Sequence, residues 1–182
     1  ATFQQAKEDG VTVLEIGEDV WGLKEFFHND IDELVESFTS AQREIAPEIE
    51  LRLQIGLSRH CPISYLEDCL SYFWGNKNFY SIDLYGDEFA QPIENFKGIY
   101  RRAKKEGLRL KAHVGEWGTA KDIRTAVEEL ELDEVQHGIA AAGDESVIRF
   151  LAENKIRLNI TPTSNVLLGR VADMAEHPIG KL

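Results

Sequence analysis

Short apolar segments alternate along the chain with longer segments whose apolar residues recur every three or four positions. The short segments are bounded by turn-forming residues, which is typical of strands. Six of them are predicted as strands: Val11–Ile16, Leu51–Leu57, Phe79–Leu84, Leu108–Val114, Glu134–His137 and Ile156–Ile160. The longer segments are predicted as helices: residues 1–9, Ile31–Ala46, Tyr65–Trp74, Ile93–Lys105, Ala120–Leu130 and Glu145–Asn154. The chain is therefore predicted as a regular strand–helix series.

Two of these helices also carry end signals. Gly107 follows the helix Ile93–Lys105, at the position where glycine commonly ends a helix. Thr119 precedes the helix Ala120–Leu130, and Asp122 follows three residues later, which resembles a capping box. These signals support the helix boundaries that the periodicity predicts.

Strands that alternate with helices predict an α/β protein with a parallel sheet. A doubly wound sheet fits the series, although no Gly-rich phosphate loop follows the first strand. A (β/α)8 barrel also fits, but it requires eight strand–helix units, and this sequence has six. The length of 182 residues favours one domain over residues 1–182.

Composition and charge narrow the classes of partner. The chain has 20 Lys and Arg against 32 Asp and Glu, a formal net charge of −12. Nucleic-acid affinity depends largely on Lys and Arg, so we expect no nucleic-acid partner. No apolar run approaches the ~20 residues of a membrane span, so we expect no membrane partner. The two cysteines do not make a disulfide framework and favour the cytoplasm. The oligomeric state is not predicted.

Polar, titratable residues follow the predicted strands, at the end where an α/β barrel builds its active site. His113 ends the fourth strand, and Glu116 follows with Gly115 between them. Neutral imidazole is a common zinc ligand, and a glutamate can move protons to and from a metal-bound water. The alternative is a strand-end histidine bonded to the backbone and a solvated glutamate.

Two neighbouring strand ends add further candidates. His137 ends the strand after the one that carries His113, so the two imidazoles would converge in a barrel, although a single buried histidine is often structural. After the third strand, Gly86 could bring a backbone N–H close to a flat ligand. Asp83 and Glu88 could accept hydrogen bonds from that ligand, or they could be exposed acids in a turn.

Two later segments have simpler interpretations. In Thr161–Asn165, proline ends the strand, and Ser164 or Asn165 could cap the next helix. The pair His177–Pro178 marks a helix end and a turn.

Taken in order, these segments resemble the adenosine and AMP deaminase branch of the metal-dependent amidohydrolases. The family pattern has a DLxGDE segment, a HxGE segment, a GHG-like segment, a CPxSN segment and a late HP. The corresponding segments here are DLYGDE (83–88), HVGE (113–116), QHG (136–138), TPTSN (161–165) and HP (177–178). Several short motifs in one order are far more specific than any one of them.

The resemblance implies a (β/α)8 barrel with one zinc ion at its carboxyl-end mouth. By similarity, His113 would be a zinc ligand. Glu116 would donate a proton to a purine ring nitrogen, and His137 would orient and deprotonate the attacking water.

The resemblance also implies how the purine is held. The backbone of Gly86 would bond another ring nitrogen, and Glu88 and Asp83 would help to hold that loop. Ser164 and Asn165 would support the pocket.

Two parts of the family pattern are missing from this sequence. The first strand of the family carries a HxH pair of zinc ligands, whereas the histidines here are residues 28, 60, 113, 137 and 177. The eighth strand carries an adjacent Asp-Asp pair, which is also missing. We therefore expect strands two to seven of the barrel, in a chain that is part of a longer enzyme. One histidine cannot complete a four-coordinate zinc site, so we expect this chain alone to be inactive.

The leading functional hypothesis is zinc-dependent hydrolytic deamination of an adenosine-like purine nucleoside or a related purine, a small-molecule substrate. Two alternatives remain. The chain could belong to a non-catalytic binding module, or the barrel could run another amidohydrolase reaction, such as opening a cyclic amide.

Overall fold

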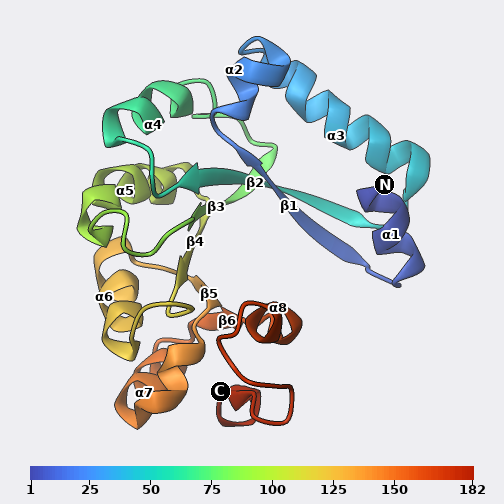
Figure 1. Ribbon diagram of the computed structural model, residues 1–182. Coiled ribbons are helices and arrows are strands. Elements are labelled where there is room, and N and C mark those ends of the chain that lie inside the picture. Colours follow the sequence, from blue (N-terminus) through green and yellow to red (C-terminus); the bar gives the residue numbers. More distant parts are fainter. The chain divides into compact units, whose positions relative to one another are not determined.

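The computed structural model describes residues 1–182 as helices and strands in alternation (Figure 1). The strands are β1 Val13–Asp19, β2 Glu50–Ser58, β3 Phe79–Tyr85, β4 Arg109–Val114, β5 Glu134–His137 and β6 Arg157–Asn159. The helices are α1 Thr2–Glu8, α2 Gly22–Phe27, α3 Ile31–Ile45, α4 Ile63–Leu70, α5 Lys97–Glu106, α6 Ala120–Leu130, α7 Glu145–Glu153 and α8 Pro162–Leu167. Short 3₁₀ helices cover Ile93–Phe96, Ile139–Gly143 and Pro178–Lys181.

The six strands form one sheet in the order β1-β2-β3-β4-β5-β6. The pairs β1–β2, β4–β5 and β5–β6 are parallel. Sequential order with parallel pairing confirms the predicted α/β class and its six strand–helix units. It also excludes a doubly wound sheet, in which the strand order reverses at a switch point.

Details of the helices differ from the prediction. Helix α2 was not predicted, because its six residues are too few to show a clear helical period. The segment predicted as one helix from Ile93 begins as a 3₁₀ helix and becomes α-helical at Lys97. Two predicted end signals are confirmed: Gly107 is the C-cap of α5, and Thr119 with Asp122 forms a capping box on α6. The predicted cap at Ser164 or Asn165 is wrong, because α8 begins at Pro162 and both residues lie inside it.

The chain divides into two compact units. The first unit comprises Ala1–Leu57 and Cys61–Ile82, and the second comprises Ser58–His60 and Asp83–Leu182. The prediction of a single domain over residues 1–182 stays a prediction.

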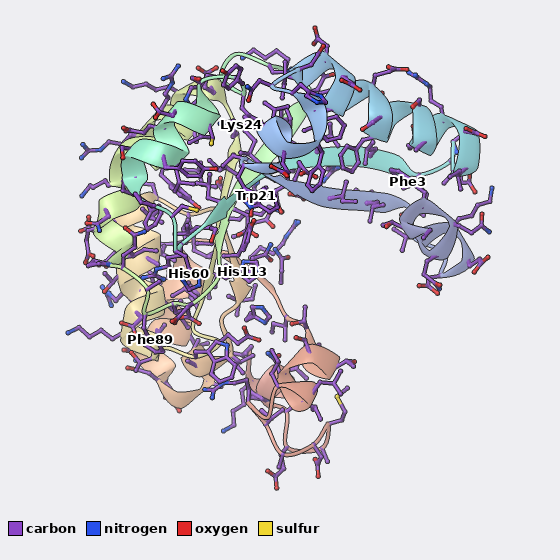
Figure 2. All side chains as sticks on the ribbon, turned by 45° about the horizontal axis from the view of Figure 1, so that its top comes forward. Phe3, Trp21, Lys24, His60, Phe89 and His113 are labelled. Atoms are coloured by element: carbon purple, nitrogen blue, oxygen red, sulfur yellow. The ribbon has the colours of Figure 1, made fainter.

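In the first unit, α1 and α3 pack together over a small apolar cluster. The cluster contains the buried residues Phe3, Ala6, Ala46 and Ile49. Phe3 projects from α1, near the amino terminus (Figure 2). On β1, Glu15 accepts hydrogen bonds from Gln54 and Ser81, so the strands of this unit are also joined by polar side chains.

In the second unit, α5, α6 and α7 lie on one side of β4, β5 and β6, and α8 lies on the other (Figure 1). Leu110, Ala112 and Val135 are among the buried apolar strand residues. The α8 side therefore faces a different set of strand side chains from the helical layer, because successive side chains of a strand alternate between its faces.

A buried charged cluster joins the last three strands. Lys111 and Glu134 are opposite each other in register, with Nζ and Oε2 3.2 Å apart, and are only 4% and 2% exposed. Glu134 also accepts hydrogen bonds from Arg109, at 3.1 Å, and from Asn159, at 2.9 Å. The carboxylate is thus shared by three strands, and its burial is compensated by ionic partners.

None of the helices combines the length and the apolar composition needed to cross a lipid bilayer.

Candidate active site

His113 lies at the end of β4 against a carboxylate from β3. Its Nδ1 is 3.3 Å from Oδ1 and 3.1 Å from Oδ2 of Asp83, which is 3% exposed. Because a carboxylate only accepts, Nδ1 carries the hydrogen and Nε2 is left to face another group. Burial lowers the pKa of His113, but the hydrogen bond and charge of Asp83, with the charge of Glu116, outweigh burial and raise the pKa overall.

The chain turns sharply after His113, and glycine makes the turn possible. Gly115 has φ +73°, and a Cβ there would lie 2.4 Å from the side chain of Ile123. A residue with a side chain would therefore meet both backbone strain and a clash. The turn brings Glu116 back toward the strand ends.

Glu88, from the segment after β3, holds this turn. Its carboxylate accepts hydrogen bonds from the backbone N–H groups of Gly115, Glu116 and Trp117 at 2.7, 2.9 and 2.8 Å. Glu88 is 7% exposed, so these bonds form away from bulk water. The side chain contacts the backbone of the turn, and its predicted contribution to substrate binding stays a prediction.

Glu116 and His137 meet at the carboxyl ends of β4 and β5. Oε1 of Glu116 lies 3.2 Å from Nδ1 of His137, and both side chains are about nine-tenths buried. The rings of His113 and His137 are 5.2 Å apart between centroids. His137 has φ +64°, an uncommon conformation for a residue other than glycine. Burial, with the charge of His113, lowers the pKa of His137 despite the opposing charge of Glu116.

Gly86 lies in a separate hollow beside these groups. It has φ +99°, and a Cβ there would lie 3.2 Å from the ring of His60. The hollow, about 290 Å³ in volume, is lined by Gly86, Asp87, Phe89 and Trp117. Phe89 is 70% exposed and lies in the segment after β3 (Figure 2). Two accessible aromatic rings beside a bare backbone make this hollow suitable for a flat ligand.

A family model described as adenosine deaminase matches residues 2–182. The chain belongs to the adenosine deaminase family. A curated relative from Treponema pallidum, named as a putative adenosine/adenine deaminase, is 39% identical over 181 residues. The alignment covers 100% of this chain and 60% of that relative, so the chain spans less than two thirds of the relative's length.

Solved structures of the family have the same fold. The adenine deaminase from Arthrobacter aurescens superposes with a TM-score of 0.84 at 24% identity, over 99% of this chain and 56% of that one. An amidohydrolase from Burkholderia ambifaria with bound Zn gives 0.81 at 23% identity, over 97% and 51% of the two chains. The chain thus has the fold of part of a (β/α)8-type deaminase, as the resemblance implied.

The zinc ion that the family resemblance implies can be tested against the donors present. His113 has the arrangement typical of a metal-binding histidine, because its Nδ1–H is held by a carboxylate and Nε2 is left for a metal. No group of three or more His, Cys, Asp or Glu in residues 1–182 is arranged to hold a metal ion. Residues 1–182 therefore supply one suitable zinc ligand, His113, and do not form a complete zinc site.

Two residues make contacts in the site that the sequence analysis did not predict. Thr161 Oγ1 lies 3.0 Å from Nδ1 of His137, although the sequence predicted only that the strand ends at the neighbouring proline. Arg170 donates from Nε to the carbonyl oxygen of Glu116 at 2.6 Å and stacks over Trp117, 4.5 Å from the ring centroid. No local signal marks Arg170, because both contacts join residues more than 50 positions apart in the chain.

Proposed function

We propose that the protein containing this chain removes the exocyclic amine of a 6-aminopurine, adenine or adenosine, by hydrolysis. The observation that carries this proposal is the contact of Glu116 with His137, 3.2 Å between Oε1 and Nδ1, beside the ring of His113. An acid and a base that share one small space are what proton transfer to and from one substrate requires. The curated relative with 39% identity is named for the same two substrates.

Each side chain has a distinct part in this reaction. Glu116 in its protonated form gives a proton to the ring nitrogen that becomes basic as water adds to the purine. His137 orients the water and accepts its proton. Asp83 holds His113 by its Nδ1–H at 3.1 Å, which fixes the direction of Nε2. The roles of Glu116 and His137 are those that the family resemblance implies, and the 3.2 Å contact between the two side chains supports them.

His113 is proposed as one zinc ligand, with the remaining ligands outside this chain. The bound zinc of the Burkholderia relative and the Asp83–His113 contact support this assignment. When bound, zinc lowers the pKa of water and stabilises developing negative charge.

The substrate is proposed to lie with its ring against Gly86. Gly86 lines the hollow together with Phe89 and Trp117, and its φ of +99° is one that glycine adopts readily. Gly86 would bond a ring nitrogen, as the resemblance implies. Glu88 and Asp83 would support the loops around the substrate through the turn at Gly115 and through His113.

The specific test is Glu116→Gln in the protein produced from its full reading frame. Glutamine keeps the shape but has no acidic proton, so we expect kcat for adenine or adenosine to fall by about 10²- to 10⁴-fold. Zinc content, measured by atomic emission, should be unchanged. The matched control is Glu153→Gln, at an exposed position of α7, which should leave kcat unchanged. Near-normal turnover in Glu116→Gln would defeat the assigned role.

A non-catalytic module is the second candidate, because residues 1–182 do not form a complete metal site. Metal analysis of the full protein separates the two candidates. Stoichiometric zinc supports the deaminase, and its absence under metal-replete conditions supports the module. A panel of aminopurines and cyclic amides separates deamination from another amidohydrolase reaction.

A further inference from the structure

Behind the Glu116–His137 pair lies a second polar group that the proposed reaction has not used. Asn165, from α8, is completely buried, and His177, from the segment before the last 3₁₀ helix, is 8% exposed. Nε2 of His177 lies 3.1 Å from Oδ1 of Asn165. Two buried polar side chains in contact must have compatible donors and acceptors, because an unmatched pair would cost the desolvation of both groups.

A backbone amide fixes the polarity of this pair. The N–H of Ile179 donates to Nδ1 of His177 at 3.1 Å. A backbone N–H cannot act as an acceptor, so Nδ1 carries no hydrogen, and the ring is neutral with its hydrogen on Nε2. Nε2–H must then face an acceptor, which is Oδ1 of Asn165. A rotated Asn165 amide would place two donors against each other, so the amide has one permitted orientation.

That orientation points the amide nitrogen at the proposed acid and base. Nδ2 of Asn165 lies 3.3 Å from Oε1 of Glu116 and 3.3 Å from Nδ1 of His137. The amide nitrogen can only donate, and it donates to Oε1 of Glu116. His137, which accepts a proton at Nε2 in the proposed reaction, carries its own hydrogen on Nδ1 and donates it to the same oxygen at 3.2 Å. An oxygen that receives an N–H is disfavoured as the protonated oxygen of a carboxylic acid. The acidic hydrogen of Glu116 is therefore directed to Oε2.

We propose that His177 and Asn165 are positioning residues, which fix the orientation and the protonated oxygen of Glu116 through one continuous series of hydrogen bonds that starts at the Ile179 N–H. This inference rests on the proposed function, in which Glu116 is the proton donor. It gives His177, which is the N-cap of the last 3₁₀ helix, a role beyond the helix end and turn that the sequence predicts at His177–Pro178. Neither residue needs to touch the substrate, because each acts through the next group in the series.

The first test measures the tautomer and needs no substrate. We would record nitrogen-15 spectra of the full protein labelled at histidine, and assign the signals of His177 from their loss in His177→Gln. The expected result is a neutral ring with hydrogen on Nε2 and a bare Nδ1. A hydrogen on Nδ1, in either the neutral or the charged ring, would overturn the proposal whatever the enzyme's activity.

The second test compares two substitutions of His177 by steady-state kinetics. His177→Phe keeps a ring but loses the donor, so kcat should fall about 10- to 100-fold, the usual effect of removing such an outer hydrogen-bond partner. KM should stay within about twofold. His177→Gln can donate and accept through its amide and should recover most of the lost kcat. Thr163→Ala, at an exposed position of α8, is the control and should match the wild type.

The outcomes separate the two proposals. Equal losses in the Phe and Gln variants, or no loss in either, would contradict positioning by His177. If His177→Phe does not fold, the wild-type tautomer decides. A wild-type protein that deaminates no aminopurine would defeat the proposed function, whereas the tautomer of His177 would still be measured independently.

Discussion

At the scale of single residues, backbone conformation decides where the candidate chemistry lies. Gly115 allows the chain to reverse within two residues of His113, and His137 adopts φ +64° without being glycine. Such conformations cost free energy that the surrounding contacts must supply, and they cluster at functional sites. The site is therefore positioned by a few strained residues as well as by the strands that end there.

The first prediction concerns Gly115. Gly115→Ala adds a Cβ 2.4 Å from Ile123 at φ +73°, so the free energy of unfolding should fall by about 1–3 kcal/mol. Urea unfolding measures the change. Gly98→Ala is the matched control, because that position in α5 has open space and alanine favours the helix. A Gly115 variant as stable as the control would show that the turn relaxes around the added carbon.

At the scale of elements, the segment after β3 holds the turn after β4 through one carboxylate. Glu88 accepts three consecutive backbone N–H groups, Gly115 to Trp117, an arrangement that only a side chain with two acceptor oxygens can satisfy so fully. The sequence showed that the segments after β3 and after β4 are polar and that they follow neighbouring strands of the predicted barrel. It did not show that one of them bonds the backbone of the other.

The second prediction tests this carboxylate. Glu88→Gln loses the charge and one acceptor oxygen, so at least one buried N–H is left unpaired, at a cost of about 1–3 kcal/mol. Hydrogen exchange of the amides of residues 115–117 should speed up more than exchange in β5. Glu94→Gln, exposed in the 3₁₀ helix before α5, serves as the control and should leave exchange at the turn unchanged. Unchanged protection at residues 115–117 in Glu88→Gln would contradict the role of the carboxylate.

Most elements could be predicted from the sequence, because strand and helix periods are local properties. The short helix α2 could not, since six residues show too little of a period. Within the candidate site, motif order identified His113, Glu116 and His137. The contacts of Asp83 with His113, and of Arg170 with Glu116, could not be predicted, because each depends on how separate strands and loops approach in the folded chain.

At the scale of the whole molecule, stability in acid should depend on the buried cluster around Glu134. Burial alone would raise the pKa of Glu134, but Asn159, Lys111 and Arg109 together lower it below its ordinary value of 4.5. A depressed folded-state pKa stabilises the fold above the unfolded-state pKa, and this contribution is lost as the pH falls through the folded-state value. The stabilising contribution of Glu134 is therefore lost as the pH falls below about 4.5.

The third prediction follows from this sign. In Glu134→Gln the carboxylate cannot titrate, so stability between neutral pH and pH 4.5 should be lower than in the wild type, and the decline below pH 4.5 should be shallower. Thermal unfolding followed by circular dichroism across pH 3–7 measures both. Glu153→Gln, exposed on α7, provides the control curve. An acid decline as steep as that of the wild type would exclude Glu134 as its source.

The bond network of Glu88 has a consequence for how such sequences can change. The DLYGDE and HVGE segments are about thirty positions apart in the chain. Even so, the Glu88 carboxylate of the first segment accepts hydrogen bonds from the backbone of the second. The two motifs are therefore structurally dependent on each other. A substitution that shortens or neutralises the side chain at 88 would displace Glu116 without changing any residue of the HVGE segment.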